Sequence, residues 1–208
     1  MRNVMPILHQ MQMSGNCYKV RLAARQLGIP ITLKNYPLHD GTTRKPPFLK
    51  LNPNGRVPLL EFEDGRCLAE SGAILFHLSE GTKLQPGNEW DRAQMLQWMF
   101  FEQYSHEPYV AVARYWLTFA PPEELEKKRH LVPEWHAKGN AALGVMESHL
   151  KSRDWFAGND YSIADIALYA YTHCAADGGF DLGSFPRISA WLARVAAQPK
   201  HIPLAEHW

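Results

Sequence analysis

Four small or polar residues, Ser14, Gly15, Asn16 and Cys17, stand in a row where a helical pattern begins. Serine and asparagine both cap helix N-termini, and both carry hydrogen-bond donors. The free backbone N–H groups and partial positive charge of a helix N-terminus attract anions. The stretch therefore predicts either ordinary helix capping or a place where these residues meet a ligand.

The segment NGRVPLL could present its backbone to a ligand. Proline cannot donate to a β-ladder, so Val57-Pro58 is expected to open a strand. If the bond is cis, the chain turns sharply and the N–H and C=O of Val57 face outward, ready to pair with a short extended peptide. The alternative is a trans proline that simply starts the strand.

Charged residues flank this segment. Glu70 and Ser71 stand where the last predicted strand passes into a helix. The helix N-terminus with the Ser71 hydroxyl suits a carboxylate, and Glu70 suits an ammonium, so the pair fits an amino-acid head group. Arg44 and Arg56 bracket the loop before Val57 and could clamp a carboxylate at the other end of a peptide. Taken singly, Glu70 and Ser71 are better explained as simple helix capping with Glu70 solvated, and the two arginines as ordinary loop residues.

Taken together, these features describe a site for a tripeptide such as glutathione. The helix at Ser14 would then point its N-terminus at the ligand's thiol. A thiol of pKa about 8.5 is mostly protonated at neutral pH, and a helix N-terminus or a nearby donor lowers that value. On this hypothesis Ser14 donates to the thiolate, Gly15 permits close approach, Asn16 is the N-cap or a second donor, and Cys17 packs inside the first turn.

The first eighty residues contain the elements that would position these groups. Apolar residues at helical spacing precede a glycine and a proline that stop the helix, and Asp64-Gly65 is a strong hairpin turn. The expected elements are a strand over 4–8, a helix over 17–27, a strand over 31–35, an irregular segment, the hairpin and a helix over 71–81. A helix between the first two strands implies a parallel crossover, and the hairpin adds an antiparallel edge.

After a turn-rich linker at 82–89 the strand pattern disappears. Pro108 is expected to kink the long helical stretch that follows, because proline removes a backbone donor. Pro133 is expected to interrupt or restart the next helix. Two further helical patterns complete a predicted helical bundle. In one of them Ser162 is expected to cap the helix while Asp165 reaches back, a folding element with no catalytic role.

Composition excludes several classes of function. Apolar residues make up 46% and charged residues 21%, and the formal net charge is +1. These values indicate a globular protein with no basic field for nucleic acid or an anionic membrane. No apolar run approaches the length of a membrane helix. The three scattered cysteines and ten scattered histidines show no metal-ligand spacing, so no metal is expected, and the cysteine usage points to a reducing cytoplasm.

The stretches SGNCYKVRLAARQLG, FLKLNPNGRVPLLEFEDG, LAESGAILFHL and SIADIALYAY together resemble the cytosolic glutathione transferases over nearly the whole chain. The resemblance implies an α/β thioredoxin-like domain over 1–81, an all-α helical domain over 89–208 and a homodimer. It implies a cis bond at Pro58 and places the Glu70-Ser71 pair on the γ-glutamyl group. Arg44 and Arg56 match positions near the glycine carboxylate that are commonly lysine and glutamine, so the arginines are a departure.

The position of Ser14 is similar to that of the catalytic serine in the serine-type classes. Gln10 stands at the position of the catalytic tyrosine, which disfavours a tyrosine mechanism. Gly15 and Asn16 replace residues of the zeta-class Ser-Ser-Cys segment, which disfavours a zeta-like isomerase. Beta-class enzymes use a cysteine in this turn, and Cys17 lies one position late for that role, which leaves a cysteine mechanism as a weak alternative.

The resemblance implies conjugation of the glutathione thiolate to a hydrophobic electrophile, bound in a pocket of the helical domain. Tyr104 is the leading candidate for this pocket; Phe101 and Tyr115 are further candidates, for which packing against neighbouring helices is the favoured explanation. The alternatives are glutathione-dependent disulfide or peroxide reduction, or a non-catalytic glutathione-fold binding protein. The presence of Ser14, Glu70 and Ser71 favours an enzyme.

Overall fold

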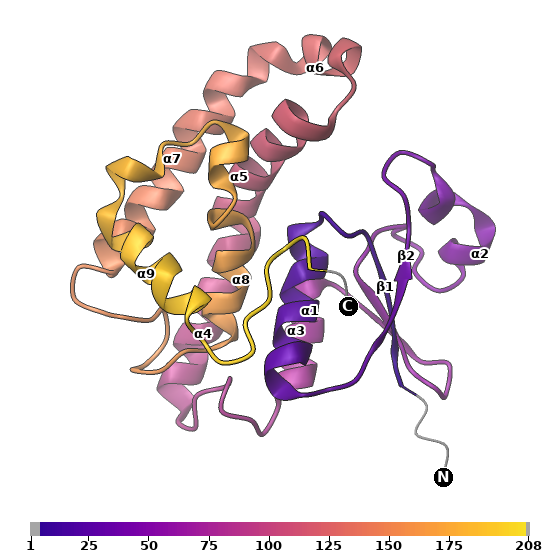
Figure 1. Cartoon of the computed structure of the whole chain (residues 1–208), viewed down its shortest axis with the longest axis horizontal. Helices are drawn as coiled ribbons and strands as arrows, with labels where there is room; N and C mark the ends of the chain where they lie inside the picture. Colours follow the sequence, from indigo (N-terminus) through magenta and orange to yellow (C-terminus); the bar gives the residue numbers. More distant parts are fainter. Residues whose placement is uncertain (1–4, 207–208) are drawn as a thin grey trace. The chain divides into compact units, whose positions relative to one another are not determined.

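A computed structural model describes residues 5–206 (Figure 1). The chain forms two compact units, one of Met1–Thr82 with Pro199–Trp208 and one of Lys83–Gln198. The expected division assigned residues 199–208 to the helical domain, whereas the contacts of residues 199–206 place them with the first unit. This C-terminal segment therefore returns to the α/β unit after the last helix.

The first unit contains a four-stranded mixed sheet in the order β2-β1-β3-β4. The strands are β1 (Ile7–Gln10), β2 (Thr32–Asn35), β3 (Leu59–Glu61) and β4 (Cys67–Ala69). Strands β1 and β2 are parallel, while β3 is antiparallel to both β1 and β4. This confirms the predicted crossover and hairpin. The first strand ends two residues later than expected, and Val4 lies outside the described residues.

Helices α1 (Gly15–Leu27) and α3 (Ser71–Ser79) pack together on one face of the sheet (Figure 1). Their apolar sides meet the strands in a core made by Leu8, Val20, Ala24, Ile31, Leu60 and Ile74. Gly28 ends α1 in the left-handed conformation, with φ of 71°, as the glycine predicted.

The opposite face of the sheet is covered by the short helix α2 (Pro46–Leu49), which follows a 3₁₀ turn at Thr42–Arg44 (Figure 1). Phe48 of α2 packs edge-on against the rings of His9 and Tyr36. The buried His9 ring is hydrogen-bonded to Tyr36 Oη (2.8 Å) and Glu61 Oε2 (2.7 Å), which joins β1 to β3 and to the residue that follows β2. Burial lowers the pKa of His9.

The second unit is helical, as predicted. Its α-helices are α4 (Glu89–Phe101), α5 (Glu107–Arg114), α6 (Pro122–Lys128), α7 (Val132–His149), α8 (Ile163–Thr172) and α9 (Pro186–Ala196). Two of these helices, α5 and α7, begin one residue before the prolines that were expected to kink or interrupt the helical pattern. A π-helical segment, Glu102–His106, precedes Pro108 in the first turn of α5, and Pro133 lies in the first turn of α7.

The predicted capping box begins α8. Asp165 is completely buried and accepts hydrogen bonds from Ser162 N (3.0 Å), Phe156 N (3.2 Å) and Trp191 Nε1 (2.9 Å). Burial raises the pKa of Asp165 to about 6, against the opposing effect of these donors. Asp165 therefore joins α8 to α9 and to the preceding loop, which is the folding role expected for it.

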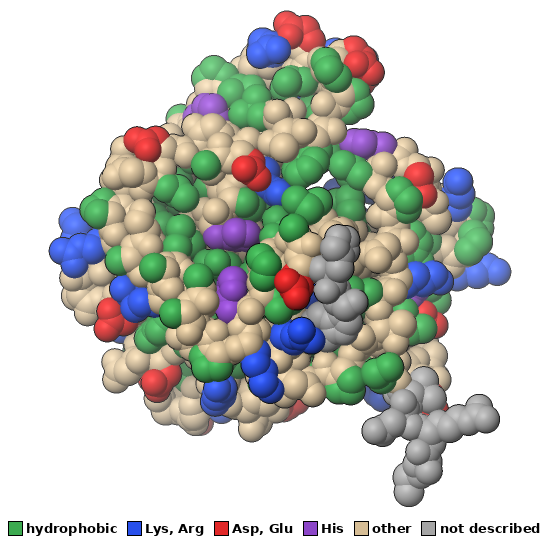
Figure 2. Space-filling view, in the orientation of Figure 1, with side chains coloured by type: hydrophobic (Ala, Val, Ile, Leu, Met, Phe, Trp, Pro, Cys, Tyr) green, Lys and Arg blue, Asp and Glu red, His purple; other side chains and the backbone are tan. Residues whose placement is uncertain are grey.

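Acidic and basic side chains are interspersed over the face drawn in Figure 2, in keeping with the formal charge of +1. Among the helices of residues 5–206, none is long and apolar enough to cross a bilayer. Within the same residues no group of three or more His, Cys, Asp or Glu side chains is placed to hold a metal ion.

Candidate active site

The strand register brings the predicted ligand-binding segments to one end of the sheet. His9 of β1 is paired with Leu59 of β3, and Leu59 is paired with Ala69 of β4. The turn before α1 therefore leaves the sheet where Val57-Pro58 enters it and where the chain passes into α3. These three segments belong to the first unit, so the tripeptide site proposed from the sequence gathers within one compact body.

Ser14 is the N-cap of α1. Its extended backbone (φ −75°, ψ 122°) precedes the helix, and its Oγ accepts a hydrogen bond from Cys17 N at 3.3 Å. Because the oxygen is the acceptor in this bond, the hydroxyl proton is directed elsewhere and can be donated. The alternative that Asn16 is the N-cap is wrong, since Asn16 lies inside the first turn.

Asn16 instead joins the two helices. Its Oδ1 accepts hydrogen bonds from Lys19 Nζ at 2.8 Å and from Ser71 Oγ at 3.2 Å. Two donors on Oδ1 turn the Nδ2 group of the amide away from them. Asn16 thus aligns the first turn of α1 with that of α3, and Lys19, only 1% exposed, brings a positive charge beside it.

Cys17 is packed, as expected. Its side chain is completely buried, and Sγ accepts a hydrogen bond from Met11 N at 3.4 Å. Burial is the main reason that its thiol pKa is raised. A protonated, inaccessible thiol is a poor nucleophile, which argues against the cysteine mechanism.

The Val57–Pro58 bond is cis, so the sharp turn expected at this point is present. Within residues 5–206, no hydrogen bond engages the backbone N–H or C=O of Val57. The loop before it is held by a side-chain hydrogen bond and a close backbone approach. Asn52 Nδ2 donates to the Arg56 carbonyl at 2.8 Å, and a Cβ on Gly55 (φ 63°) would lie only 2.9 Å from the Thr43 carbonyl oxygen.

Glu70 holds the α3 N-terminus in an unusual conformation. It has φ of 69° and ψ of 118°, on the side of the Ramachandran map that favours glycine. Such strain in a non-glycine residue costs of order 1–3 kcal/mol and is concentrated at functional sites. Ser71 is the first residue of the helix, so the alternative that it is the N-cap is wrong. The structure has an exposed carboxylate at Glu70 beside a buried hydroxyl at Ser71.

Arg44 and Arg56 are both exposed around the same loop. Arg44 Nη1 donates to the Asn54 carbonyl at 2.7 Å, so its guanidinium is held against the loop. Arg56 contributes its backbone carbonyl to the loop, and its side chain faces solvent. Both can supply donors to an anion, although neither is part of a buried anion site.

The three candidate electrophile-contacting residues have different surroundings in the second unit. Phe101 packs against Trp98, with ring centroids 5.1 Å apart, and borders a shallow depression of about 500 Å³ between α4 and α7. Tyr104 is 85% exposed. Tyr115 contacts Trp116, and burial raises its pKa. Their role in a second-substrate pocket stays a prediction.

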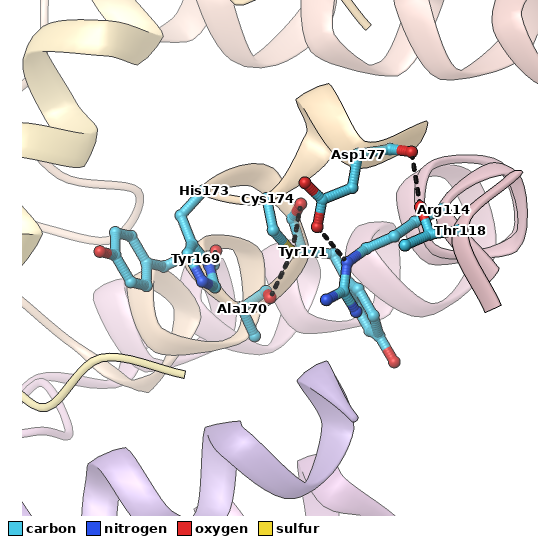
Figure 3. Close-up of polar contacts among 8 residues, drawn as sticks. All are labelled: Arg114, Thr118, Tyr169, Ala170, Tyr171, His173, Cys174 and Asp177. Carbon is cyan, nitrogen blue, oxygen red and sulfur yellow. Dashed lines mark hydrogen bonds and ion pairs between the residues drawn. The ribbon is translucent and has the colours of Figure 1, made fainter. Parts of the chain in front are cut away.

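Sequence reasoning missed a polar cluster around the end of α8. The buried Arg114 of α5 donates from Nε to Asp177 Oδ2 at 3.0 Å, and Thr118 Oγ1 donates to the Asp177 carbonyl at 2.8 Å (Figure 3). Cys174 lies beside this pair, and burial raises its pKa to about 11. Arg114 follows an apolar run on α5, where an arginine is unusual, and this was the one local signal.

Comparison with known proteins agrees with this geometry. Models of the glutathione S-transferase N-terminal and C-terminal domains match residues 13–80 and 97–199. Glutathione S-transferase D7 of Anopheles gambiae is 32% identical over 91% of this chain and 85% of its own length. The disulfide-bond oxidoreductase YfcG of Escherichia coli is 26% identical over 88% and 87% of the two chains.

Solved structures give the same result. The crystal structure of a glutathione S-transferase from Pseudomonas fluorescens is 46% identical and has a TM-score of 0.93, covering 98% of this chain and all of that one. The sheet with its cis-proline turn, the helical unit and these full-length relatives agree. The chain therefore belongs to the glutathione transferase family.

Proposed function

We propose that this glutathione transferase is of the serine type, with Ser14 donating its hydroxyl hydrogen bond to the thiolate of bound glutathione. The observation that carries the proposal is the N-cap geometry. Ser14 Oγ accepts from Cys17 N, so its proton is available at the N-terminus of α1. The helix N-terminus adds its partial positive charge at the same place. Both effects lower the thiol pKa and release its proton to solvent.

The remaining first-unit residues hold the rest of the tripeptide in this proposal. The α3 N-terminus and Ser71 bind the γ-glutamyl carboxylate, while Glu70 binds the ammonium. The unengaged N–H and C=O of Val57, set outward by the cis bond to Pro58, pair with the cysteinyl backbone. Arg44 and Arg56 attract the glycine carboxylate from the surface of the loop.

In conjugation, the thiolate sulfur attacks an electrophilic carbon, a carbon–sulfur bond forms and the leaving group departs with its electron pair. Positioning and thiolate stabilisation supply the rate enhancement. We propose a small hydrophobic electrophile that contacts Tyr104, with Phe101 and Tyr115 nearby, and a detoxifying role in the cytoplasm. No metal takes part in this chemistry.

The experiment that tests the serine assignment is the pKa of glutathione bound to the wild type and to Ser14→Ala, read from thiolate absorbance. The proposal expects a higher pKa in the variant with glutathione still bound. An unchanged pKa would overturn it.

Glutathione-dependent disulfide reduction is the second candidate. The similarity to the disulfide-bond oxidoreductase of Escherichia coli favours it. In that reaction the glutathione thiolate attacks one sulfur of a disulfide, the S–S bond breaks and the other sulfur leaves as a thiolate. A second glutathione thiolate then attacks the glutathione sulfur of the mixed disulfide, which forms glutathione disulfide and releases the remaining substrate sulfur as a thiolate. A screen of aryl halides, peroxides and mixed disulfides with the purified protein and glutathione distinguishes the two activities.

We further propose that the protein is a homodimer, as is usual in this family. Sedimentation at micromolar concentration should give a mass of about two chains. A mass of one chain, 23.8 kDa, would contradict the proposal.

A further inference from the structure

The segment after α9 is bound to the first unit through its backbone. Its carbonyls at alternate residues, Ile202, Leu204 and Glu206, accept hydrogen bonds from Tyr18 Oη (2.6 Å), Arg21 Nη2 (2.9 Å) and Gln12 Nε2 (2.7 Å). We call residues 201–206 the C-terminal strap. The strap ends in a turn, which Glu206 N closes by donating to the Pro203 carbonyl at 3.0 Å.

Arg21 is the most unusual partner of the strap. Its side chain is 1% exposed, and no acidic group lies in ion-pair distance within residues 5–206. One nitrogen, Nη2, donates to both the Gln12 carbonyl and the Leu204 carbonyl at 2.9 Å, while among the described residues Nε and Nη1 find no hydrogen-bond partner. Burying a cation in this way is costly. Its two hydrogen bonds to residues 5–206 join the strap to the turn before α1.

Gln12 makes the second connection between the strap and that turn. Its Nε2 donates to the carbonyls of Glu206 and, at 3.3 Å, Leu204. Its Oε1 accepts from Gln10 Nε2 at 3.1 Å, and the same Gln10 nitrogen donates to Asn35 Oδ1 at the end of β2. Gln12 is therefore fixed to the strap on one side and to the sheet on the other.

Ser14 is two residues from Gln12 in the same turn, which closes through Ser14 N donating to the Met11 carbonyl at 3.1 Å. The backbone carbonyl of Gln12 is bound by Arg21 and its side chain by the strap. Gln12 is therefore hydrogen-bonded to the strap and to Arg21, and only one residue of the chain separates it from Ser14. A displacement of the turn would move the Ser14 donor away from a bound thiolate, and such bonds depend steeply on position.

We infer that the C-terminal strap, acting through Gln12 and Arg21, positions the Ser14 turn for thiolate stabilisation. The inference rests on the proposed role of Ser14. It makes Gln12 and Arg21 positioning residues, which touch neither glutathione nor the electrophile. The strap thus links the end of the chain to the reactivity of the thiol.

The test compares Gln12→Ala, Arg21→Lys and a chain ending at Gln198 with the wild type. Arg21→Lys keeps the charge but loses the nitrogen that spans both carbonyls. Ala205→Ser is the matched control, because its side chain is exposed and lies between two residues whose carbonyls are anchored. The readouts are the pKa of the bound glutathione thiol, the dissociation constant of glutathione, and hydrogen exchange of the Ser14 and Cys17 amides.

In Gln12→Ala and Arg21→Lys, we expect the thiol pKa to rise by about one unit, equivalent to a tenfold lower thiolate fraction at neutral pH. Glutathione should still bind within about threefold of wild type, and the two amides should exchange faster. The Ile74 amide, bonded to the Glu70 carbonyl, should exchange as in the wild type. The control should match the wild type throughout.

Two results would overturn the inference. One is an unchanged thiol pKa in Gln12→Ala and Arg21→Lys when Ser14→Ala raises it. The other is unchanged exchange of the turn amides in the two substitutions and in the shortened chain. Failure of the proposed function has a different signature, since Ser14→Ala would then leave the thiol pKa unchanged. If the shortened chain does not fold, the two single substitutions decide.

Discussion

The Ser71 hydroxyl donates to Asn16 Oδ1 at 3.2 Å, and this bond joins the first turns of α3 and α1. In the proposed site, one helix receives the γ-glutamyl group and the other receives the thiol. The bond therefore couples the two ends of the glutathione site within a single compact unit.

Replacing Ser71 with alanine should weaken glutathione binding only modestly, by about 0.5–1.5 kcal/mol. The hydroxyl is already engaged with Asn16, and the backbone N–H groups of the α3 N-terminus stay in place. The bound thiol pKa should also rise slightly, because Asn16 loses one of its donors. Calorimetric titration with a parallel thiolate absorbance measurement checks both effects. Unchanged glutathione affinity together with an unchanged thiol pKa would contradict the role of Ser71 in the site.

Glu70→Gln should have the larger effect on binding. It keeps the shape of the side chain but removes the charge offered to the ligand ammonium, at an expected cost of about 1.5–3 kcal/mol. Glu63→Gln, which removes an exposed carboxylate in the hairpin turn, is the matched control. Equal glutathione affinities for the two variants would contradict the role of Glu70.

The cysteines should differ sharply in reactivity. Cys17 is completely buried, and burial raises the pKa of Cys174 to about 11, whereas Cys67 is partly exposed. A thiol reagent should therefore modify Cys67 in the native protein and reach the other two only after unfolding. Cys17→Ser should leave conjugation nearly unchanged. Complete loss of activity in that variant would restore the cysteine mechanism.

Asp165 should make stability depend on pH. Its pKa in the folded protein, about 6, lies above the ordinary value of 3.8, so the folded state binds the extra proton between these values. The contribution is fully present below about pH 4 and is lost as pH rises to about 6. Urea unfolding at several pH values should show this slope in the wild type.

The Asp165→Asn variant should lack that slope. It should also be less stable at neutral pH by about 1–3 kcal/mol, because the new Nδ2 faces the donors of Ser162. Identical pH dependence of unfolding in the two proteins would show that Asp165 does not titrate in this range.

Local patterns were enough to predict most elements of this fold, although the segment that contains α2 was expected to be irregular. Asp64-Gly65 predicted the hairpin, Gly28 the end of α1, and Ser162 with Asp165 the start of α8. The choice of cap for α1 was harder. Ser14 and Asn16 are equally good caps by type, and what decided between them was the engagement of Asn16 with Ser71, 55 residues away.

Contacts between segments that are far apart along the chain had no comparable pattern in the sequence. Arg21 meets the Leu204 carbonyl 183 residues along the chain, and Arg114 meets Asp177 63 residues away. An arginine on a helix face is usually solvated, and a backbone carbonyl acceptor carries no sequence signature. The strap and the Arg114 cluster could therefore be found only in three dimensions.

The central claim is that Ser14 stabilises the glutathione thiolate. The most direct measurement is the pKa of the bound thiol, read from thiolate absorbance in the wild type, Ser14→Ala and Asn16→Ala. The account predicts that Ser14→Ala raises this pKa by about one to two units while glutathione still binds, so the loss in conjugation rate shrinks as pH rises. An unchanged pKa in Ser14→Ala, together with a raised pKa in Asn16→Ala, would contradict it and make Asn16 the thiolate donor.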